Sequence, residues 1–228
     1  MSIADNLKTV KNRIASAAAR AGRDPSSVKL IVVTKTVDVE RINEAIKAGA
    51  AILGENRVQE AKEKIEKLGP VADWHLIGRL QTNKAKYAVK LFSLIHSVDN
   101  LELAHELDKQ AAKIGKVQDV LIEVNTSREA TKAGIEAGDA IALIKEAARL
   151  KNISIKGLMT MPPFFDDPEK ARPFFKQLRE LAEQIARENI PGVSMQELSM
   201  GMSGDFEAAV EEGATMARVG TAIFGERR

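Results

Sequence analysis

Cysteine is absent from the 228 residues of this chain, which excludes disulfides, thiolate nucleophiles and cysteine-bound metals. Aromatic residues make up only 4% of it, so we expect no stacking platform for single-stranded nucleic acid. No run approaches the ~18 apolar residues that cross a membrane. Residues 1–11 lack the apolar centre of a secretion signal. We therefore expect a cytoplasmic protein with no membrane and no nucleic-acid partner.

The residues that are present have the composition of a folded globular chain. Hydrophobic residues account for 44% and charged residues for 29%, and 34 basic against 32 acidic side chains leave a formal charge of +2. The two signs are interleaved and form no basic block, which indicates a solvated surface. No proline-, glycine- or serine-rich linker divides the sequence, so we expect residues 1–228 to form a single domain.

Short apolar or β-branched runs alternate with amphipathic stretches along the chain. Asp167-Pro168 is a typical helix start, and Asp99, with Glu102 three residues on, is expected to cap another helix. The expected strands lie at about 28–34, 50–54, 73–77, 92–98, 117–124, 153–160, 195–199 and 214–219. The expected helices lie at about 3–20, 38–48, 56–68, 82–90, 135–150, 168–187 and 204–212, with one more after Asp99.

This regular alternation indicates right-handed parallel βαβ units. Eight such units in a chain of this length fit a (β/α)8 TIM barrel better than a doubly wound open sheet. The last expected strand has no clear helix after it. We expect the amphipathic helix at 3–20 to cover that gap.

Lys35 is the first candidate for chemistry, because barrels carry their active sites at the carboxyl ends of the strands. It ends the run L-I-V-V-T-K and shares its side of the strand with Ile31 and Val33. An ammonium there is partly desolvated, which lowers its pKa and favours a free amine that can form a Schiff base with an aldehyde. The competing interpretation is a solvated lysine at a strand end.

Two glycine-containing loops follow the last two expected strands. Residues 199–205 read S-M-G-M-S-G-D, in which Gly201 and Gly204 permit close approach of the backbone. Residues 218–221 read R-V-G-T and offer backbone amides and a hydroxyl. Phosphate sites in barrels often use the loops after strands 7 and 8, so the pair of loops predicts a phosphate site.

Other side chains have simpler interpretations. Ser203 could merely cap the helix that follows it, and Asp205 in the first turn would repel an anion. His75, His96 and His105 lack the spacing of metal ligands, so we expect no metal site.

A strand-end lysine together with a phosphate site after the last two strands indicates a pocket for pyridoxal 5'-phosphate. Several motifs between about Lys29 and Gly225 strengthen this interpretation. The chain resembles the pyridoxal phosphate homeostasis protein family, which is similar in fold to the barrel domain of alanine racemase. The motifs that carry the resemblance are V-V-T-K-T, L-G-E-N-R-V-Q-E, W-H-L-I-G-R-L-Q-T-N-K, G-L-M-T-M, L-S-M-G-M-S-G-D and A-R-V-G-T-A-I-F-G.

The resemblance implies a role for each of eight residues. It implies Lys35 as the Schiff-base lysine and places Arg218 beside the pyridine nitrogen. A guanidinium stays protonated and can only donate, so it favours an unprotonated ring, which is a weaker electron sink. The remaining implied positions are Ser203, Gly220 and Thr221, with Ser199 nearby, around the phosphate, and Asn56 and His75 near the pocket wall.

The sequence departs from the family pattern at two places. Val37 stands where lysine is common after K-T, and Arg79 gives G-R-L-Q where G-P-L-Q is common. We expect neither to touch the core of the pocket. Lys132, in A-T-K-A-G-I, matches a lysine-glycine motif of the family and is expected to be an auxiliary contact.

We therefore expect a monomeric protein of vitamin B6 homeostasis that carries pyridoxal phosphate on Lys35 without turnover of its own. Apo forms of pyridoxal-dependent enzymes are its expected partners. Racemases of this fold take a second base, a tyrosine, from an additional β domain, which is not expected in this chain, and no residue pairs with Lys35 as a second base. The alternatives are a pyridoxal-dependent amino-acid racemase or decarboxylase, and a Schiff-base aldolase that uses Lys35 on a sugar phosphate.

Overall fold

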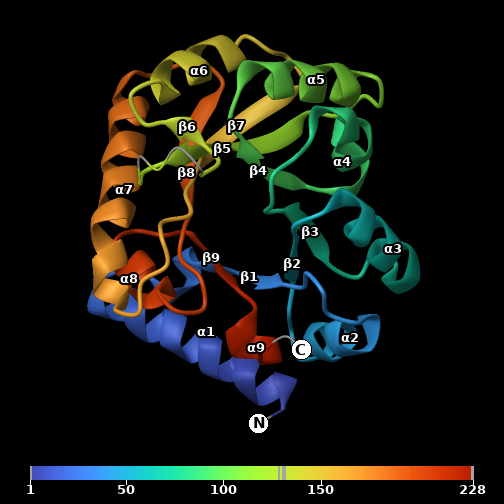
Figure 1. Cartoon of the computed structure of the whole chain (residues 1–228), viewed down its shortest axis with the longest axis vertical. Helices are drawn as coiled ribbons and strands as arrows, with labels where there is room; N and C mark the ends of the chain where they lie inside the picture. The colour runs from blue at the N-terminus through green and yellow to red at the C-terminus, as the bar shows by residue number, and fades with distance from the viewer. Residues whose placement is uncertain (1, 128, 130–131, 227–228) are drawn as a thin grey trace.

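The computed structural model describes residues 2–127, 129 and 132–226. The strands of its main sheet are β1 (Lys29–Val33), β2 (Ile52–Glu55), β3 (Asp73–Leu76), β4 (Leu94–Val98), β5 (Gln118–Asn125), β7 (Ile153–Met159), β8 (Val193–Ser199) and β9 (Met216–Val219). They pair in the order β4-β3-β2-β1-β9-β8-β7-β5, and β4 also pairs with β5, which closes the ring. Figure 1 shows this ring with the helices outside it. The expected parallel barrel is confirmed, and the open sheet is not formed.

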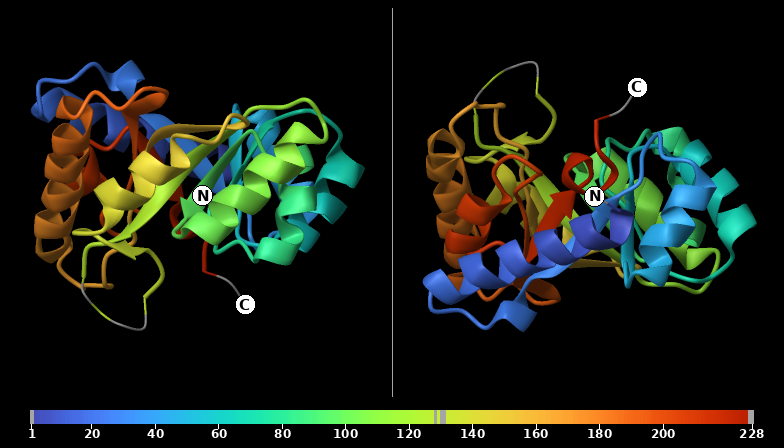
Figure 2. Two further views of the ribbon diagram at one scale, coloured as in Figure 1. Left: turned by 90° about the horizontal axis from the view of Figure 1, so that it is seen from above. Right: turned by 90° about the horizontal axis from the view of Figure 1, so that it is seen from below.

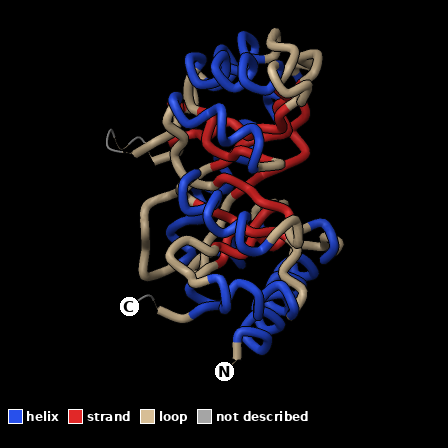
Figure 3. The backbone as a smooth tube through the Cα atoms, turned by 90° about the vertical axis from the view of Figure 1, so that its right-hand side faces the viewer, coloured by secondary structure: helices blue, strands red, loops and turns tan. Residues whose placement is uncertain are grey.

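The helices cover the outside of the barrel. They are α1 (Ile3–Arg20), α2 (Val39–Lys47), α3 (Val58–Leu68), α4 (Ala85–Leu91), α5 (Leu101–Ala112), α6 (Ala140–Ala147), α7 (Arg172–Arg187), α8 (Phe206–Glu211) and α9 (Thr221–Phe224). Seen from the side, the strands, red in Figure 3, lie inside the helices and loops. Among the described residues, no helix is both long enough and apolar enough to cross a bilayer.

Two expected helix starts are wrong in detail. Asn100, and not Asp99, caps α5: its side-chain oxygen accepts from the Leu103 amide at 2.8 Å. Residues 135–136 form a short strand, β6 (Ile135–Glu136), beside β5, in place of the first turn of the helix expected at 135–150. The backbone of Gly134 has a φ of +105° and a Cβ there would lie 2.6 Å from the Asn125 nitrogen, so the chain runs too close to β5 to turn as a helix.

The start expected at Asp167-Pro168 is present in another form. The Asp167 side chain accepts from the Glu169 amide at 3.0 Å and caps a short 3-10 helix, η3 (Pro168–Ala171). The α-helix α7 then begins at Arg172. The cap and the proline therefore start a helical segment where the sequence predicts one.

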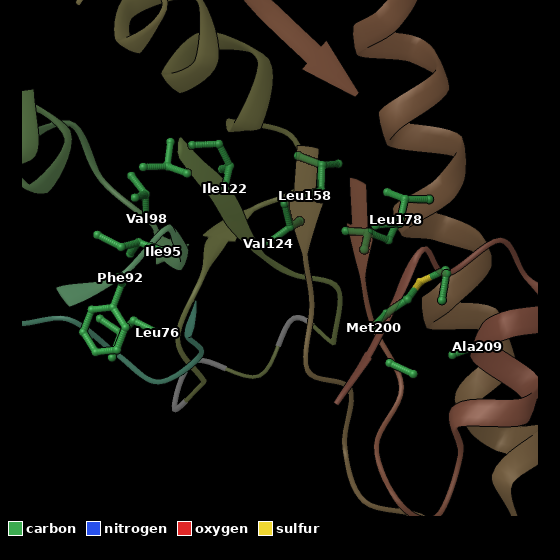
Figure 4. Packing of buried hydrophobic residues seen from close by; sticks show 14 of the residues in the cluster. Leu76, Phe92, Ile95, Val98, Ile122, Val124, Leu158, Leu178, Met200 and Ala209 are labelled. Atoms are coloured by element: carbon green, nitrogen blue, oxygen red, sulfur yellow. The ribbon is translucent and has the colours of Figure 1, made fainter. Parts of the chain in front are cut away.

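The barrel strands separate two apolar cores. The inner core lies within the ring and consists of Ile31, Leu94, Leu121, Met159 and Met216. Alternate residues of the same strands point outward and pack against the helices. Figure 4 shows part of this outer core, including Ile122 of β5 and Leu178 of α7.

The opening helix covers the gap left by a short last helix, as expected. α9 has only 4 residues, and α1 packs against α8, α9 and α2. In the right-hand view of Figure 2, α1 (blue) crosses the red C-terminal elements. The Asn6 side chain donates to the Ile223 carbonyl at 2.9 Å, and Arg13 pairs with Glu207 at 2.7 Å. The two ends of the chain thus complete the outer layer together.

Candidate functional site

A cavity of about 390 Å³ opens at the carboxyl ends of the barrel strands. Residues that follow β1, β2 and β3 form one part of its wall, and residues that follow β8 and end β9 form another. Six of the eight residues selected from the sequence meet there: Lys35, Asn56, Ser203, Arg218, Gly220 and Thr221. The other two, His75 and Ser199, lie beneath the cavity, within the barrel.

Lys35 is half-buried in the cavity wall, on the same side of the chain as Val33. Its two neighbours are held in place. The hydroxyl of Thr34 donates to Glu55 at 2.6 Å, and the Thr34 carbonyl accepts from the ammonium of Lys64 at 2.6 Å. Thr36, whose φ is +59°, donates its amide to Glu60. The backbone around Lys35 is therefore fixed by side chains of β2 and α3.

Lys64 is the centre of a buried charge cluster that the sequence analysis missed. Its ammonium lies 2.7 Å from Glu55 and 2.6 Å from Glu60. Burial raises the pKa of the Glu55 carboxyl, and hydrogen bonds from Lys64 and Thr34 oppose that rise. The only local signal is the i, i+4 spacing of Glu60 and Lys64, which is also common on solvated helices.

The loop after β8 lies against the start of α9. The Ser203 hydroxyl oxygen accepts from the amides of Gly220 and Ala222, each at 3.3 Å. Two backbone amides that converge on one oxygen suit an anion. Ser203 does not cap α8, because Asp205 occupies the cap position. The Asp205 side chain accepts from the Met202 amide at 2.6 Å, and its carboxylate therefore already has a partner.

Only one of the two loop glycines is crowded. A Cβ on Gly201, whose φ is +89°, would lie 2.6 Å from the Ala209 Cβ and 2.9 Å from the Phe206 Cα. A Cβ on Gly204 would meet nothing within 4 Å. Gly201 thus approaches neighbouring backbone closely, whereas close approach at Gly204, which lines the cavity, stays a prediction.

Arg218 is 4% exposed and enters the cavity wall from the middle of β9. Its Nη1 donates to the Ser199 hydroxyl at 2.6 Å, and its Nη2 donates to the Thr160 carbonyl at 2.9 Å. Burial lowers the pKa of Arg218 to about 10, so the guanidinium stays charged at neutral pH. Ser199 thus accepts from Arg218, whereas the amides of Gly220 and Ala222 donate to Ser203.

Two histidines continue the contacts of Arg218 through the barrel interior. The Ser199 Oγ lies 2.9 Å from Nδ1 of His96, and Nε2 of His96 lies 3.0 Å from Nδ1 of His75. Nε2 of His75 lies 3.4 Å from Oδ2 of Asp73, the first residue of β3. His75 is therefore not part of the pocket wall, because its ring is turned toward His96 within the barrel.

Two charged residues in the cavity wall were not expected there. Glu123 of β5 is 4% exposed, and burial, with the nearby Asp99 charge, raises its pKa to about 7 against the opposing charges of Arg218 and Arg79. Its inward position could have been inferred from its spacing to Leu121. Arg79 also lines the cavity, so the expectation that it stays clear of the pocket is wrong.

The other two positions noted in the sequence lie elsewhere. Val37 is buried and lies away from the cavity wall, as expected. The Lys132 amide donates to the Glu129 carbonyl at 3.1 Å. Ala130 and Thr131 of the same motif lie outside the described residues. An auxiliary contact by Lys132 stays a prediction.

A second hollow, of about 470 Å³, lies between α2 and α3. Most of its wall consists of charged residues: Asp38, Glu40, Glu60, Glu63, Lys64 and Lys67. It is larger than the first cavity but holds none of the eight residues selected from the sequence. We assign the functional site to the cavity at the strand ends, where lysine, arginine and converging amides meet.

Comparison with known proteins agrees with this geometry. Residues 5–228 match the family model described as alanine racemase, N-terminal domain. A pyridoxal phosphate homeostasis protein of Aquifex aeolicus is 48% identical over 229 residues, which cover 100% of both chains.

Solved structures give the same result at two levels of similarity. PipY of Synechococcus elongatus, determined with pyridoxal phosphate bound, has a TM-score of 0.82 and 40% identity, and the match covers 93% of this chain and 100% of that one. An alanine racemase of Clostridium difficile has a TM-score of 0.76 but only 18% identity. That match covers 98% of this chain and 57% of the racemase, and it supports the fold alone.

Proposed function

This chain belongs to the pyridoxal phosphate homeostasis protein family, and from that premise we propose that it holds pyridoxal 5'-phosphate on Lys35 for vitamin B6 homeostasis. The observation that carries the proposal is the meeting of Lys35, Arg218 and the Ser203 loop in one cavity. In the proposed link the Lys35 nitrogen joins the aldehyde carbon, and one water is released.

The phosphate end of the cavity fits an anion. The amides of Gly220 and Ala222 already point at the Ser203 oxygen, and Thr221 adds a hydroxyl to the same wall. These donors would hold the phosphate oxygens without a lysine or arginine side chain. Asn56 also lines the cavity. Gly78 approaches its backbone so closely that a Cβ on Gly78 would be 2.5 Å from the backbone carbonyl oxygen of Asn56.

Arg218 suits the ring nitrogen of the cofactor. When bound, the cofactor supplies an aldehyde carbon and an electron-withdrawing ring. Because Arg218 is buried, charged and only a donor, it favours the unprotonated ring nitrogen. The ring then withdraws electrons weakly, which supports a storage and delivery role without amino-acid turnover.

We extend the proposal to the cellular role. The protein would keep the reactive aldehyde covered and release it to apo forms of pyridoxal-dependent enzymes. The relatives named as homeostasis proteins support this role over a racemase or decarboxylase. The cytoplasmic location and the monomeric state stay predictions from the sequence.

Borohydride reduction tests the covalent link. Reduction of the loaded protein should fix a pyridoxyl group on Lys35, found by peptide mapping, and Lys35→Ala should lose both the adduct and the visible absorption band. Lys29→Ala is the matched control, because Lys29 begins β1, the strand that leads to Lys35, is exposed and pairs with Glu197. A pyridoxyl group found solely on another lysine would overturn the assignment.

An amino-acid assay tests the absence of turnover. Incubation of the loaded protein with L-alanine should leave the enantiomeric purity of the alanine unchanged. An apo-enzyme mixed with the loaded protein should gain activity. Racemisation that is present in the purified protein and absent from Lys35→Ala would contradict the proposed role while leaving the Lys35 link intact.

A further inference from the structure

The contacts from Arg218 to Asp73 form one continuous chain of hydrogen bonds. It passes through Ser199, His96 and His75, which belong to β8, β4 and β3. Its first member lies in the cavity wall and its last lies at the amino-terminal end of β3. The chain therefore connects the two mouths of the barrel through its interior.

The ends of the chain have fixed roles. A guanidinium can only donate, so Arg218 donates to Ser199. The hydrogen bond from His75 lowers the pKa of the Asp73 carboxyl, so at neutral pH Asp73 is ionised and can only accept. The proton between His75 and Asp73 must therefore belong to Nε2 of His75.

The middle of the chain follows from the neutral state of the His96 ring. Burial lowers the pKa of His96 well below its usual range, so its ring is neutral and has one donor and one acceptor nitrogen. When His75 is neutral, its Nδ1 accepts, and His96 donates to it from Nε2. Nδ1 of His96 then accepts the hydroxyl proton of Ser199.

All four hydrogen bonds thus point the same way, from the cation Arg218 to the anion Asp73. Aligned bonds of this kind strengthen one another in a medium of low dielectric constant. A second proton on His75 would reverse the middle bonds, because His75 would then donate to His96 and His96 to Ser199. Ser199 would accept twice, and its own proton would need another acceptor inside the barrel.

The charges around the chain favour the aligned arrangement. At one end, the ammonium of Lys116 lies near enough to interact electrostatically with the Asp73 carboxylate. At the other end, Glu123 and Asp205 face Arg218. A cation at one end and a carboxylate at the other favour bonds that all point from Arg218 toward Asp73.

We propose that Ser199, His96, His75 and Asp73 are positioning residues for Arg218, held in one tautomeric arrangement by the carboxylate at the far mouth of the barrel. The chain fixes one amino group of the guanidinium, and the Thr160 carbonyl fixes the other. The orientation of Arg218 toward the cofactor ring then depends on a charge at the opposite mouth. Only this last consequence rests on the proposed function.

Nitrogen NMR of histidine side chains tests the arrangement in the cofactor-free protein. At about pH 8, above the usual histidine pKa, both His75 and His96 should be protonated on Nε2 alone. His105→Gln removes the signals of the third histidine, which lies on α5. A proton on Nδ1 of His96, or a charged His75 ring at that pH, overturns the proposal.

Removal of the far carboxylate tests the coupling. In Asp73→Ala, His75 should lose its single tautomer, and the nitrogen shifts of His96 should change with it. Asp119→Ala is the matched control, because Asp119 is the second residue of β5, lies at the same mouth of the barrel and pairs with Lys156 at 3.4 Å. Unchanged His96 shifts in Asp73→Ala, or equal changes in both variants, would contradict the coupling.

The same pair of variants is then loaded with pyridoxal phosphate. Asp73→Ala should weaken binding by about three- to tenfold and shift the visible band, whereas Asp119→Ala should do neither. If wild-type protein failed to bind the cofactor at all, the proposed function would fail, and the nitrogen spectra would still decide the tautomers. If Asp73→Ala alters the His96 shifts but leaves the cofactor affinity and the visible band unchanged, the coupling to His96 stands and only its effect on Arg218 is overturned.

Discussion

The ammonium nitrogen of Lys64 lies 2.6 Å from the carbonyl oxygen of Thr34, the residue that precedes Lys35. The same ammonium contacts Glu55 and Glu60, and Glu60 accepts the amide of the residue that follows Lys35. A buried lysine on α3 thereby holds the backbone on both sides of the lysine that we assign to the cofactor.

Lys64→Met should destabilise the fold strongly, because it leaves two carboxyls without their cation. Removal of one partner from a buried ion pair typically costs about 3–5 kcal/mol, and denaturant unfolding measures the loss. Lys62→Met is the control: Lys62 pairs with Glu66 at 3.6 Å on the exposed face of the same helix, and we expect a cost below ~1 kcal/mol. Similar losses in both variants would show that Lys64 has no special role.

Ser203→Ala combined with Thr221→Val should weaken retention of the cofactor. Both changes remove a hydroxyl from the cavity wall near the converging amides. Hydrogen bonds to charged groups contribute roughly 1.5–3 kcal/mol each, so loss of both should raise the dissociation constant about a hundredfold or more. Absorption titration measures it. Thr9→Val, an exposed change on α1, serves as the control, and an unchanged constant in the double variant would argue against this phosphate site.

Glu123→Gln should change how stability depends on pH. Because the folded protein raises the pKa of Glu123 to about 7, the folded state holds this proton more tightly than the unfolded state. The stability that the protonated Glu123 carboxyl contributes is fully present below the unfolded pKa of ~4.3, and it is lost as the pH rises toward 7. The free energy of unfolding of the variant should therefore rise, relative to that of the wild type, by on the order of 3 kcal/mol between about pH 4 and pH 8.

Urea unfolding of the cofactor-free proteins across that range measures the difference. Glu63→Gln, an exposed change on α3, should show no such trend. A constant difference between wild type and Glu123→Gln would mean that the carboxyl titrates normally in the folded state.

Gly201→Ala and Gly204→Ala should differ sharply although both lie in one loop. At Gly201 a left-handed backbone costs an L residue about 1–2 kcal/mol, and the new Cβ would also press on Phe206 and Ala209. At Gly204 a Cβ meets open space, so we expect a change within ~1 kcal/mol. Thermal unfolding compares the two, and equal melting temperatures would contradict the crowding at Gly201.

The sequence predicts those features that depend on neighbouring residues. Apolar runs and helix stops mark the eight barrel strands, and the spacing of Ile31, Val33 and Lys35 places the lysine on the inward side. A local sequence pattern cannot choose between two neighbouring residues that suit the same role. Asp99 and Asn100 are both good caps, and the apolar face of α5 decides for Asn100.

The missed site residues depend on partners far away in the chain. A charged residue in a strand or helix is usually solvated, so nothing local distinguishes Lys64 from its exposed neighbours. Glu123 is recognisable only once β5 is known to have an inward side. The positions of His75 and Ser199 depend in the same way on His96, which lies between them.

The packing of α1 against α8 and α9 has a consequence for the synthesis of the protein. Residues 3–20 are synthesised well before α9, because the contact of Asn6 with Ile223 spans 217 positions. Until α8 and α9 have been made, the apolar stripe of Leu7, Val10 and Ile14 lacks two of the helices that α1 packs against. Nascent chains that stop short of Phe224 should therefore expose that stripe to molecular chaperones, and the barrel closes only after translation has passed it.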